Sequence, residues 1–236
     1  MILKDKTAII TGASDGLGKQ VALKLGEAGV NLALIARRSE KLEEVQKQIK
    51  GIKVEIYPCD VKELIQVKET VSKILADFKT IDILLNIAGI WQKKMPVEEI
   101  DEQVIDDVIS INLTGLIHMT KLVIPILKKQ PEAAIINVSS KSGVVAQVGQ
   151  SVYTASKYGV RGFTDVIRED LRGTSVKVAG VYQSGVKTEM FSKTGEKFKE
   201  EVFEKFTDPK DLASAIVFML SQPPHIWLEE IRINNK

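Results

Sequence analysis

Short apolar runs alternate with longer amphipathic segments along the chain, and this alternation constrains the fold more than any other feature. The short runs are apolar at successive positions, which is typical of strands that helices cover on both faces. Strict alternation of strands with helices predicts a parallel, doubly wound α/β sheet of about seven strands. We expect strands at 7–11, 31–36, 54–57, 81–86, 133–139, 176–182 and 230–233, and helices at 17–28, 39–50, 62–78, 101–129, 153–171 and 209–220, the second with Ser39 as its N-cap.

The 236 residues show no linker-like change of composition, no low-complexity tract and no repeat of solenoid period. A chain of this length can bury a substantial core. We therefore expect one domain that spans residues 1–236.

Charge and cysteine usage limit the partners and the location. The 33 basic and 31 acidic residues give a formal net charge of +2, so we expect no nucleic-acid or membrane-surface partner. The single Cys59 excludes an internal disulfide and favours the cytoplasm. Charges among the first six residues argue against a signal peptide. His118 and His225 have no carboxylates at ligand spacing, so we expect no bound metal.

A glycine-rich turn stands between the first expected strand and the first expected helix. Gly12 would permit the tight turn, Gly16 would let the backbone approach a pyrophosphate, and Gly18 would let the helix pack closely. A glycine-rich turn without a ligand is the alternative, but the position after the first strand of a β-α-β unit favours a Rossmann-type dinucleotide site. We expect its cofactor residues to be Gly12, Ser14, Asp15, Gly16, Leu17 and Gly18.

The end of the second expected strand indicates which dinucleotide binds. An acidic residue there would bind the ribose 2′-hydroxyl of NAD, but this chain has Ala36-Arg37-Arg38. A guanidinium can bind the 2′-phosphate of NADP through paired charge-assisted hydrogen bonds. Two solvated arginines at a helix start are the alternative. Arg37 and Arg38 therefore predict NADPH as the cofactor.

Tyr153 and Lys157 are four residues apart, so they share one face of the expected helix. A free tyrosine has a pKa of about 10, which is too high for an efficient proton shuttle at neutral pH. We expect the nearby ammonium, together with the charge of an oxidised nicotinamide, to lower the pKa of Tyr153. Alone, such a pair is usually a solvated helix face, so its meaning depends on the residues around it.

Together with these features, the chain resembles the short-chain dehydrogenase/reductase family over essentially its whole length. Ser140 precedes Tyr153 by thirteen residues, as the catalytic serine of that family does, which selects it over Ser139. The ordered features that carry the resemblance are Thr11 to Gly18, Asp60, Asn86 to Gly89, Asn112, Ser139-Ser140, Tyr153-x-x-x-Lys157 and Gly185-Val186-x-Thr188.

The resemblance implies a role for each catalytic residue. Tyr153 would give its proton to the carbonyl oxygen, and Ser140 would polarise that carbonyl by a hydrogen bond. Lys157 would bind the nicotinamide ribose and depress the pKa of Tyr153. Asn112 would hold the water that connects Lys157 to solvent.

The resemblance also implies the remaining cofactor contacts. Asp60 would meet the adenine amine and Val61 the adenine ring, while Val186 and Thr188 would contact the carboxamide. The loop after the fourth strand would add Asn86, Ala88 and Gly89. The chain departs from the family pattern at Ile87, where a second asparagine is usual, and at Ser184, where proline is usual.

The substrate would lie beyond the carboxyl ends of the strands, which places the segments 91–95, 142–150 and 189–206 around it. A mobile apolar lid is expected at about 189–206, although its phenylalanines could equally pack a short helix onto the body. The apolar helix at 104–127 exceeds what one sheet contact needs, so a homodimer or homotetramer is expected, with deep burial as the alternative.

The leading interpretation is an NADPH-dependent reductase of a small ketone, aldehyde or 3-oxo acid, reversible in principle. A non-catalytic NADPH-binding regulator on the same fold is the main alternative, since a fold does not establish an activity. A sugar-nucleotide epimerase or dehydratase is a third, but it would need a larger C-terminal substrate region.

Overall fold

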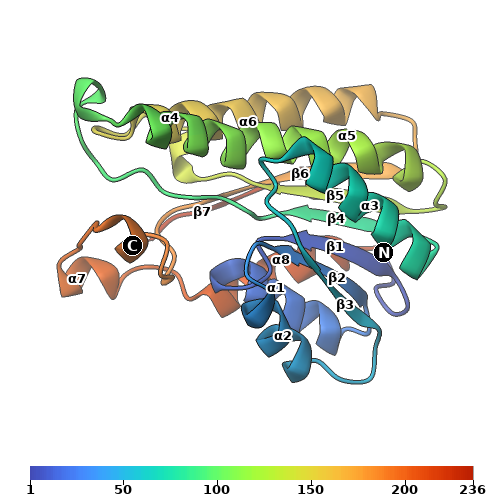
Figure 1. Cartoon of the computed structure of the whole chain (residues 1–236). Helices are drawn as coiled ribbons and strands as arrows, with labels where there is room; N and C mark the ends of the chain where they lie inside the picture. The colour runs from blue at the N-terminus through green and yellow to red at the C-terminus, as the bar shows by residue number, and fades with distance from the viewer. Residues whose placement is uncertain (236) are drawn as a thin grey trace.

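The computed structural model describes residues 1–235, and within them all strands join one parallel sheet of seven strands. The sheet order is β3-β2-β1-β4-β5-β6-β7 (Figure 1). Strands β2 and β3 are added on one side of β1 and strands β4 to β7 on the other, so the direction in which strands are added reverses at the boundary between β1 and β4. In a doubly wound sheet this reversal opens a crevice at the carboxyl ends of the strands. The strands are β1 (Thr7–Thr11), β2 (Asn31–Ala36), β3 (Val54–Pro58), β4 (Ile83–Asn86), β5 (Ala133–Val138), β6 (Val176–Gln183) and β7 (Glu230–Ile233).

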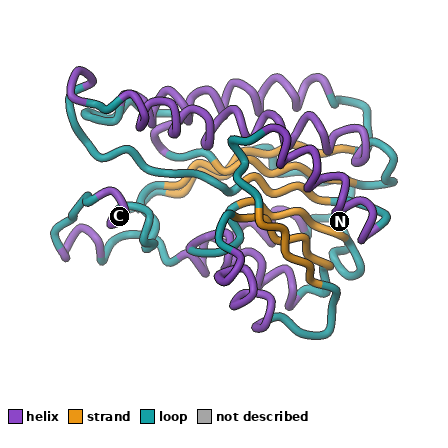
Figure 2. The backbone as a smooth tube through the Cα atoms, in the orientation of Figure 1, coloured by secondary structure: helices purple, strands orange, loops and turns teal. Residues whose placement is uncertain are grey.

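Helices cover both faces of the sheet, as the tube in Figure 2 shows. One layer contains α1 (Gly16–Glu27), α2 (Ser39–Gln48) and α8 (Pro209–Leu220). The other contains α3 (Leu64–Phe78), α4 (Glu102–Ile109), α5 (Gly115–Leu127) and α6 (Ser151–Asp170). The short α7 (Glu200–Phe203) lies away from both layers. The expected doubly wound α/β architecture is confirmed.

Strand β1 explains why the apolar runs do not alternate. All five of its residues are buried, and successive side chains enter opposite cores because strand side chains alternate between faces. Ile9 packs under α3 and α5, whereas Ala8 and Ile10 pack under α1 and α8. Both faces of this strand therefore need apolar residues.

Two expected boundaries are wrong for identifiable reasons. Ser39 is the first residue of α2 and not its cap, because Arg38 occupies the N-cap position without a side-chain hydrogen bond. Strand β4 begins at Ile83, just after Asp82, whose carboxylate accepts hydrogen bonds from the Thr7 N–H at 2.9 Å and the Lys6 ammonium at 3.0 Å.

Helices α4 and α5 form one continuous run, Glu102–Leu127, joined by a π-helical turn at Ser110–Thr114. By length and composition alone this run could cross a membrane. Its Val108, Met119 and Val123 side chains are fully buried within the protein core, as in the core helix of a globular fold. The π-turn interrupts regular packing at Asn112 (Figure 1 shows the run).

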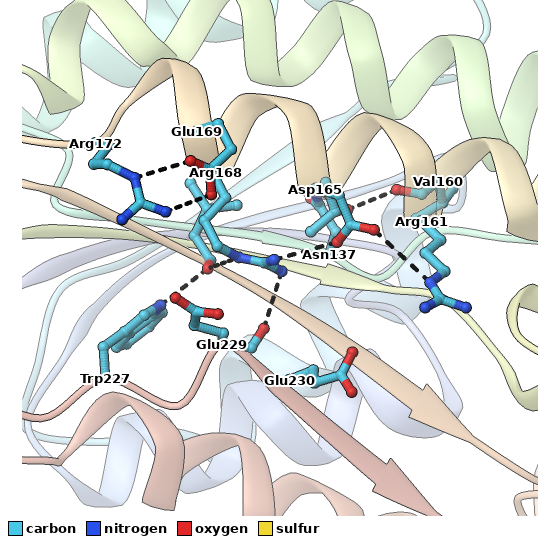
Figure 3. A network of polar contacts seen from close by, with 12 residues as sticks. Asn137, Val160, Arg161, Asp165, Arg168, Glu169, Arg172, Trp227, Glu229 and Glu230 are labelled. Atoms are coloured by element: carbon cyan, nitrogen blue, oxygen red, sulfur yellow. Dashed lines mark hydrogen bonds and ion pairs between the residues drawn. The ribbon is translucent and has the colours of Figure 1, made fainter.

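The carboxyl-terminal half of α6 is tied to β6 and to the chain before β7 (Figure 3). The Arg168 guanidinium donates to the carbonyl oxygens of Val178 and Glu229, each at 3.2 Å, and pairs with Asp165. The Trp227 indole N–H donates to the Val178 carbonyl as well, at 2.9 Å. These contacts hold the far end of α6 against the sheet.

Candidate active site

A cleft of about 1110 Å³ opens at the carboxyl edge of the sheet, beyond the paired ends of β1 and β4. Its walls come from the glycine-rich turn, the ends of β2 to β6, the start of α6 and the expected lid. The predicted site residues that line it are Gly12, Ser14, Asp15, Gly16, Leu17, Gly18, Arg37, Arg38, Asp60, Val61, Ala88, Gly89, Ser140, Tyr153, Lys157, Val186 and Thr188.

The glycine-rich turn has the geometry that its sequence predicts. Gly12 has a φ of +71°, and a Cβ there would lie 2.9 Å from the Ala88 backbone, so a side chain would separate β1 from the loop after β4. A Cβ on Gly18 would collide with the Gly12 carbonyl. Asp15 caps α1, because its Oδ1 accepts the Gly16 N–H at 2.7 Å.

Tyr153 and Lys157 lie one turn apart on α6 and face the end of β5. Only 5% of Tyr153 and 4% of Lys157 is exposed. The Lys157 ammonium donates to the Val138 carbonyl at 3.2 Å and lies 5.7 Å from the centre of the Tyr153 ring. Ser140 follows β5 and forms a hydrogen bond with Tyr153. The structure thus brings the predicted acid, its polarising serine and its lysine together.

Ser139 has a different place from Ser140. Its hydroxyl donates to the Lys157 carbonyl at 2.9 Å, and its side chain is buried. That hydroxyl is used to fix α6 against β5, although Ser139 also borders the cleft beside Ser140. The spacing argument that selected Ser140 agrees with this geometry.

The pKa of Tyr153 is not lowered as expected. Burial raises it to about 12, and the hydrogen bond from Ser140 only partly opposes that rise. Lys157 is itself buried, which lowers the pKa of its ammonium to about 8. Removing both groups from water destabilises their charged forms. The protein groups alone therefore do not make Tyr153 acidic, and it is a protonated phenol at neutral pH, while the lowering expected from an oxidised nicotinamide stays a prediction.

Asn112 is fully buried in the π-turn and does not line the cleft. Its Oδ1 accepts the Ile90 N–H at 2.8 Å, and its Nδ2 donates to the Ile90 carbonyl at 3.0 Å and to Ser156 at 3.2 Å. A Cβ on Gly89 would lie 3.2 Å from Asn112 Oδ1 and 3.6 Å from the Lys157 ammonium. Asn112 thus joins the loop after β4 to α6, close to Lys157.

Asn86 is not a side-chain ligand of the cleft, contrary to expectation. Its Nδ2 donates to Thr120 at 2.9 Å and to Asn137 at 2.8 Å, within the core. Asn137 (Figure 3) in turn donates a hydrogen bond from its Nδ2 to the Thr164 hydroxyl on α6, at 2.9 Å. The Nδ2 group of Asn86 therefore joins β4 to α5 and β5, while its buried Oδ1 has no hydrogen-bond partner among the described residues.

The end of the cleft where the adenosine is expected to bind, called the adenosine end below, is the exposed end. Arg37 approaches Asp60 at 3.8 Å and Arg38 approaches Asp15 at 3.6 Å, with 61% and 48% of the two arginine side chains exposed. Both guanidiniums line the cleft beyond the end of β2. They form a cationic corner beside the glycine-rich turn.

The segment at 189–206 packs over the opposite end of the cleft. Its Phe191 ring lies 4.9 Å from Trp91, and the Trp91 ring lies 4.6 Å from Tyr153. Phe206 packs against Gly185, where a Cβ would approach its ring to 2.6 Å. Lys193 pairs with Asp15 at 2.7 Å. Trp91 lies in the segment 91–95 that is expected around the substrate, but its packing against the Tyr153 ring has no signal in the sequence.

Matches to a family model and to two related proteins identify the family of this chain. A family model described as short chain dehydrogenase matches residues 6–199. The 3-oxoacyl-(acyl-carrier-protein) reductase FabG of Thermotoga maritima is 34% identical over 228 residues, which cover 94% of this chain and 92% of that protein. An uncharacterized oxidoreductase of Staphylococcus aureus (strain MW2) is 30% identical and covers 98% of both chains.

The chain belongs to the short-chain dehydrogenase family.

Solved structures of short-chain dehydrogenases and similar enzymes agree with the fold of this family member. An alcohol dehydrogenase from Thermococcus sibiricus, complexed with 5-hydroxy-NADP, superposes with a TM-score of 0.87 at 25% identity, covering 97% of this chain and 96% of its own. A serine dehydrogenase complexed with NADP+ has a TM-score of 0.86 at 26% identity, covering 96% and 93%. As a short-chain dehydrogenase, the protein is an oxidoreductase.

Proposed function

We propose that the protein is an NADPH-dependent oxidoreductase that transfers a hydride between nicotinamide and the carbon of a carbonyl group or secondary alcohol. The observation that carries the proposal is the buried group of Ser140, Tyr153 and Lys157 on the wall of a cleft that also contains the glycine-rich turn. Its substrate would be a ketone, an aldehyde or a 3-oxo acid.

The residues of the cleft fit a dinucleotide. Gly12 and Gly18 keep the turn free of side chains, so backbone N–H groups at the start of α1 can face a pyrophosphate. Arg37 and Arg38 supply the charge that a 2′-phosphate needs. Several relatives in the solved structures hold NADP, which supports the choice of NADPH.

NADPH supplies the hydride when it is bound. Tyr153, held as a neutral phenol by burial, would donate its proton to the substrate oxygen. Ser140 would donate a hydrogen bond to the same oxygen and stabilise its developing charge. Both groups lie in a water-poor site, where such interactions are stronger than in bulk water.

Lys157 would restore the proton of Tyr153 after each turnover. Its pKa of about 8 lets it exchange protons near neutral pH. Asn112 would support this exchange, because it holds the Ile90 backbone beside the Lys157 ammonium. The remaining predicted contacts would be Asp60 and Val61 to adenine and Val186 and Thr188 to the carboxamide.

We further propose that the enzyme works in the cytoplasm as a homodimer or homotetramer on a small-molecule substrate. Members of the family generally oligomerise. Leu113, Ile117, Leu122 and Ile126 on the long apolar helix run are only half-buried, which leaves apolar surface for a second subunit. A monomeric mass by light scattering at micromolar protein would count against the oligomer.

The decisive experiment follows NADPH absorbance over a panel of ketones, aldehydes and 3-oxo thioesters, with NADH run beside it. Turnover of any panel member separates an enzyme from a non-catalytic NADPH-binding regulator. The assay should also give a lower KM for NADPH than for NADH. Tight NADPH binding with no turnover across the panel would favour the regulator.

A further inference from the structure

The catalytic helix α6 begins without a cap of its own. Gln150 precedes its first residue and makes no side-chain hydrogen bond to the helix. The first four N–H groups of any helix lack partners within the helix and need others. Tyr153 stands in this first turn, so the partner of its backbone N–H bears directly on where its ring lies.

That partner is Gln92, which lies 61 residues earlier in the chain. Gln92 Oε1 accepts the Tyr153 N–H at 3.0 Å and the neighbouring Val152 N–H at 3.1 Å. A side chain from the loop after β4 therefore caps the catalytic helix from outside. Only 1% of Gln92 is exposed, so water does not compete for these bonds.

The other half of the Gln92 amide is also occupied. Its Nε2 donates to the Gly149 carbonyl at 3.1 Å and to the Lys93 carbonyl at 3.3 Å. Both acceptor sites and both donors of the amide are thus used. Glutamate would keep the acceptor and lose the donors, and methionine would keep the length and lose every bond.

We infer that Gln92 is a positioning residue for Tyr153: its amide fixes the first turn of α6 relative to the loop that lines the cleft. The inference rests on the proposed function. The adjacent Trp91 packs against the Tyr153 ring at 4.6 Å, so consecutive residues hold the backbone and the ring of the same tyrosine. The same loop is fixed on its other side, where Asn112 binds Ile90.

Such a cap should affect rate more than cofactor binding. The phenol must meet the substrate oxygen within hydrogen-bond reach, and a misplacement of about 1 Å can cost roughly 100-fold in rate. Gln92 bonds only to Val152, Tyr153, Gly149 and Lys93, and none of these bonds reaches the glycine-rich turn. Losing its amide should therefore lower kcat and spare NADPH affinity.

The test compares Gln92→Met, Gln92→Glu and the matched control Gln46→Met. Gln46 also donates its side-chain amide to a backbone carbonyl, that of Val54 at 2.6 Å, but between α2 and β3. We expect Gln92→Met to lower kcat about 10- to 100-fold, with the Kd of NADPH changed less than about twofold. Gln92→Glu should recover part of that loss, and Gln46→Met should keep kcat.

Amide hydrogen exchange adds a readout that does not need turnover. Gln92→Met should speed exchange at Val152 and Tyr153 and leave the Arg168 end of α6 protected. A Gln92→Met enzyme with wild-type kcat would overturn the positioning role. So would losses of Tm and kcat that Gln46→Met reproduces. A wild-type protein inactive on every carbonyl would instead overturn the proposed function, while the exchange result still tests the cap.

Discussion

The two ends of the cleft hold their functional groups by opposite means. At the catalytic end, Tyr153, Lys157 and Asn112 are at least nine-tenths buried, and neutral groups at hydrogen-bond distance fix them. At the adenosine end, Arg37 and Arg38 are about half exposed or more, and their carboxylate partners lie 3.6 to 3.8 Å away. The catalytic end is thus buried and held by hydrogen bonds, while the adenosine end is exposed, charged and held by longer ion-pair contacts.

This difference indicates how each end should respond to change. Buried hydrogen bonds act in a medium of low dielectric constant. Removing one partner of such a bond therefore leaves the other buried polar group without a hydrogen bond, which is costly. Exposed ion pairs are screened by water and salt and contribute little each. We therefore expect large, salt-independent effects at the catalytic end and smaller, salt-dependent effects at the adenosine end.

The largest effect should follow Tyr153→Phe, which removes the proposed proton donor and nothing else. We expect kcat to fall roughly 100- to 10,000-fold, because general acid catalysis contributes about that much. The Kd of NADPH, measured by fluorescence titration, should stay nearly unchanged. Tyr158→Phe is the control, since Tyr158 lies on the same helix but is 42% exposed. Near-normal turnover of Tyr153→Phe would refute the proton-donor role.

The catalytic end also marks the limit of what the sequence could predict. Helical spacing paired Tyr153 with Lys157, and the resemblance to the family selected Ser140 and gave all three residues their roles. The rise that burial causes in the pKa of Tyr153 could not be predicted, because burial is a property of packing that spacing does not reveal. Gln92 lies in a segment expected around the substrate, but its bonds to α6 were not predicted, because they join residues 60 and 61 positions apart.

The adenosine end shows the opposite balance. Arg37 and Arg38 were found from their place at the end of β2, and exposed groups at a strand end need little packing information. Asn86 was assigned to the cofactor although its amide serves the core. The side chain of a polar residue at a strand end can face the cleft or the core. For Asn86, only its hydrogen bonds to Thr120 and Asn137 show that the side chain faces the core.

The second largest effect should follow Arg37→Ala, which removes one of the two exposed guanidiniums. We expect the Kd of NADPH to rise about 10- to 100-fold, the worth of a charge-assisted hydrogen bond, while the Kd of NADH stays the same. Raising the salt concentration should shrink the difference. Arg172→Ala is the control, because Arg172 pairs with Glu169 far along α6. Comparable wild-type Kd values for NADPH and NADH would contradict the assignment.

A third test uses pH on the catalytic end. Burial lowers the pKa of Lys157 to about 8, so its ammonium is present below that pH and is lost as pH rises through it. Raising the pH from 8 to 9 would leave roughly a tenth of Lys157 protonated. The rate of carbonyl reduction at saturating NADPH should therefore fall about fivefold over that unit. Lys157→Arg should move this alkaline limb upward, since a guanidinium stays charged. A flat profile from pH 7 to 9.5 would exclude Lys157 as the titrating group.

The smallest effect should come from Lys193→Met, which cuts the ion pair between the lid and the glycine-rich turn. Lys193 lies 2.7 Å from Asp15, but 47% of its side chain and 38% of that of Asp15 is exposed. Burial tends to raise the pKa of Asp15, yet the hydrogen bonds from Lys193 and the Gly16 N–H outweigh it and lower that pKa. The pair is therefore formed, although water and salt screen it. Since an exposed pair is worth at most about 1 kcal/mol, we expect the KM of the carbonyl substrate to rise about two- to fivefold at low salt.

That rise should vanish near molar salt, where the wild-type lid loses the same attraction. Lys199→Met is the matched control, because Lys199 is an exposed lysine of the same segment with no ion pair among the described residues. A salt-independent loss larger than that of Arg37→Ala would break the comparison between the two ends. It would mean that the Lys193–Asp15 contact behaves like the buried hydrogen bonds around Tyr153. The position of the lid would then depend on a contact with the glycine-rich turn that water and salt do not screen.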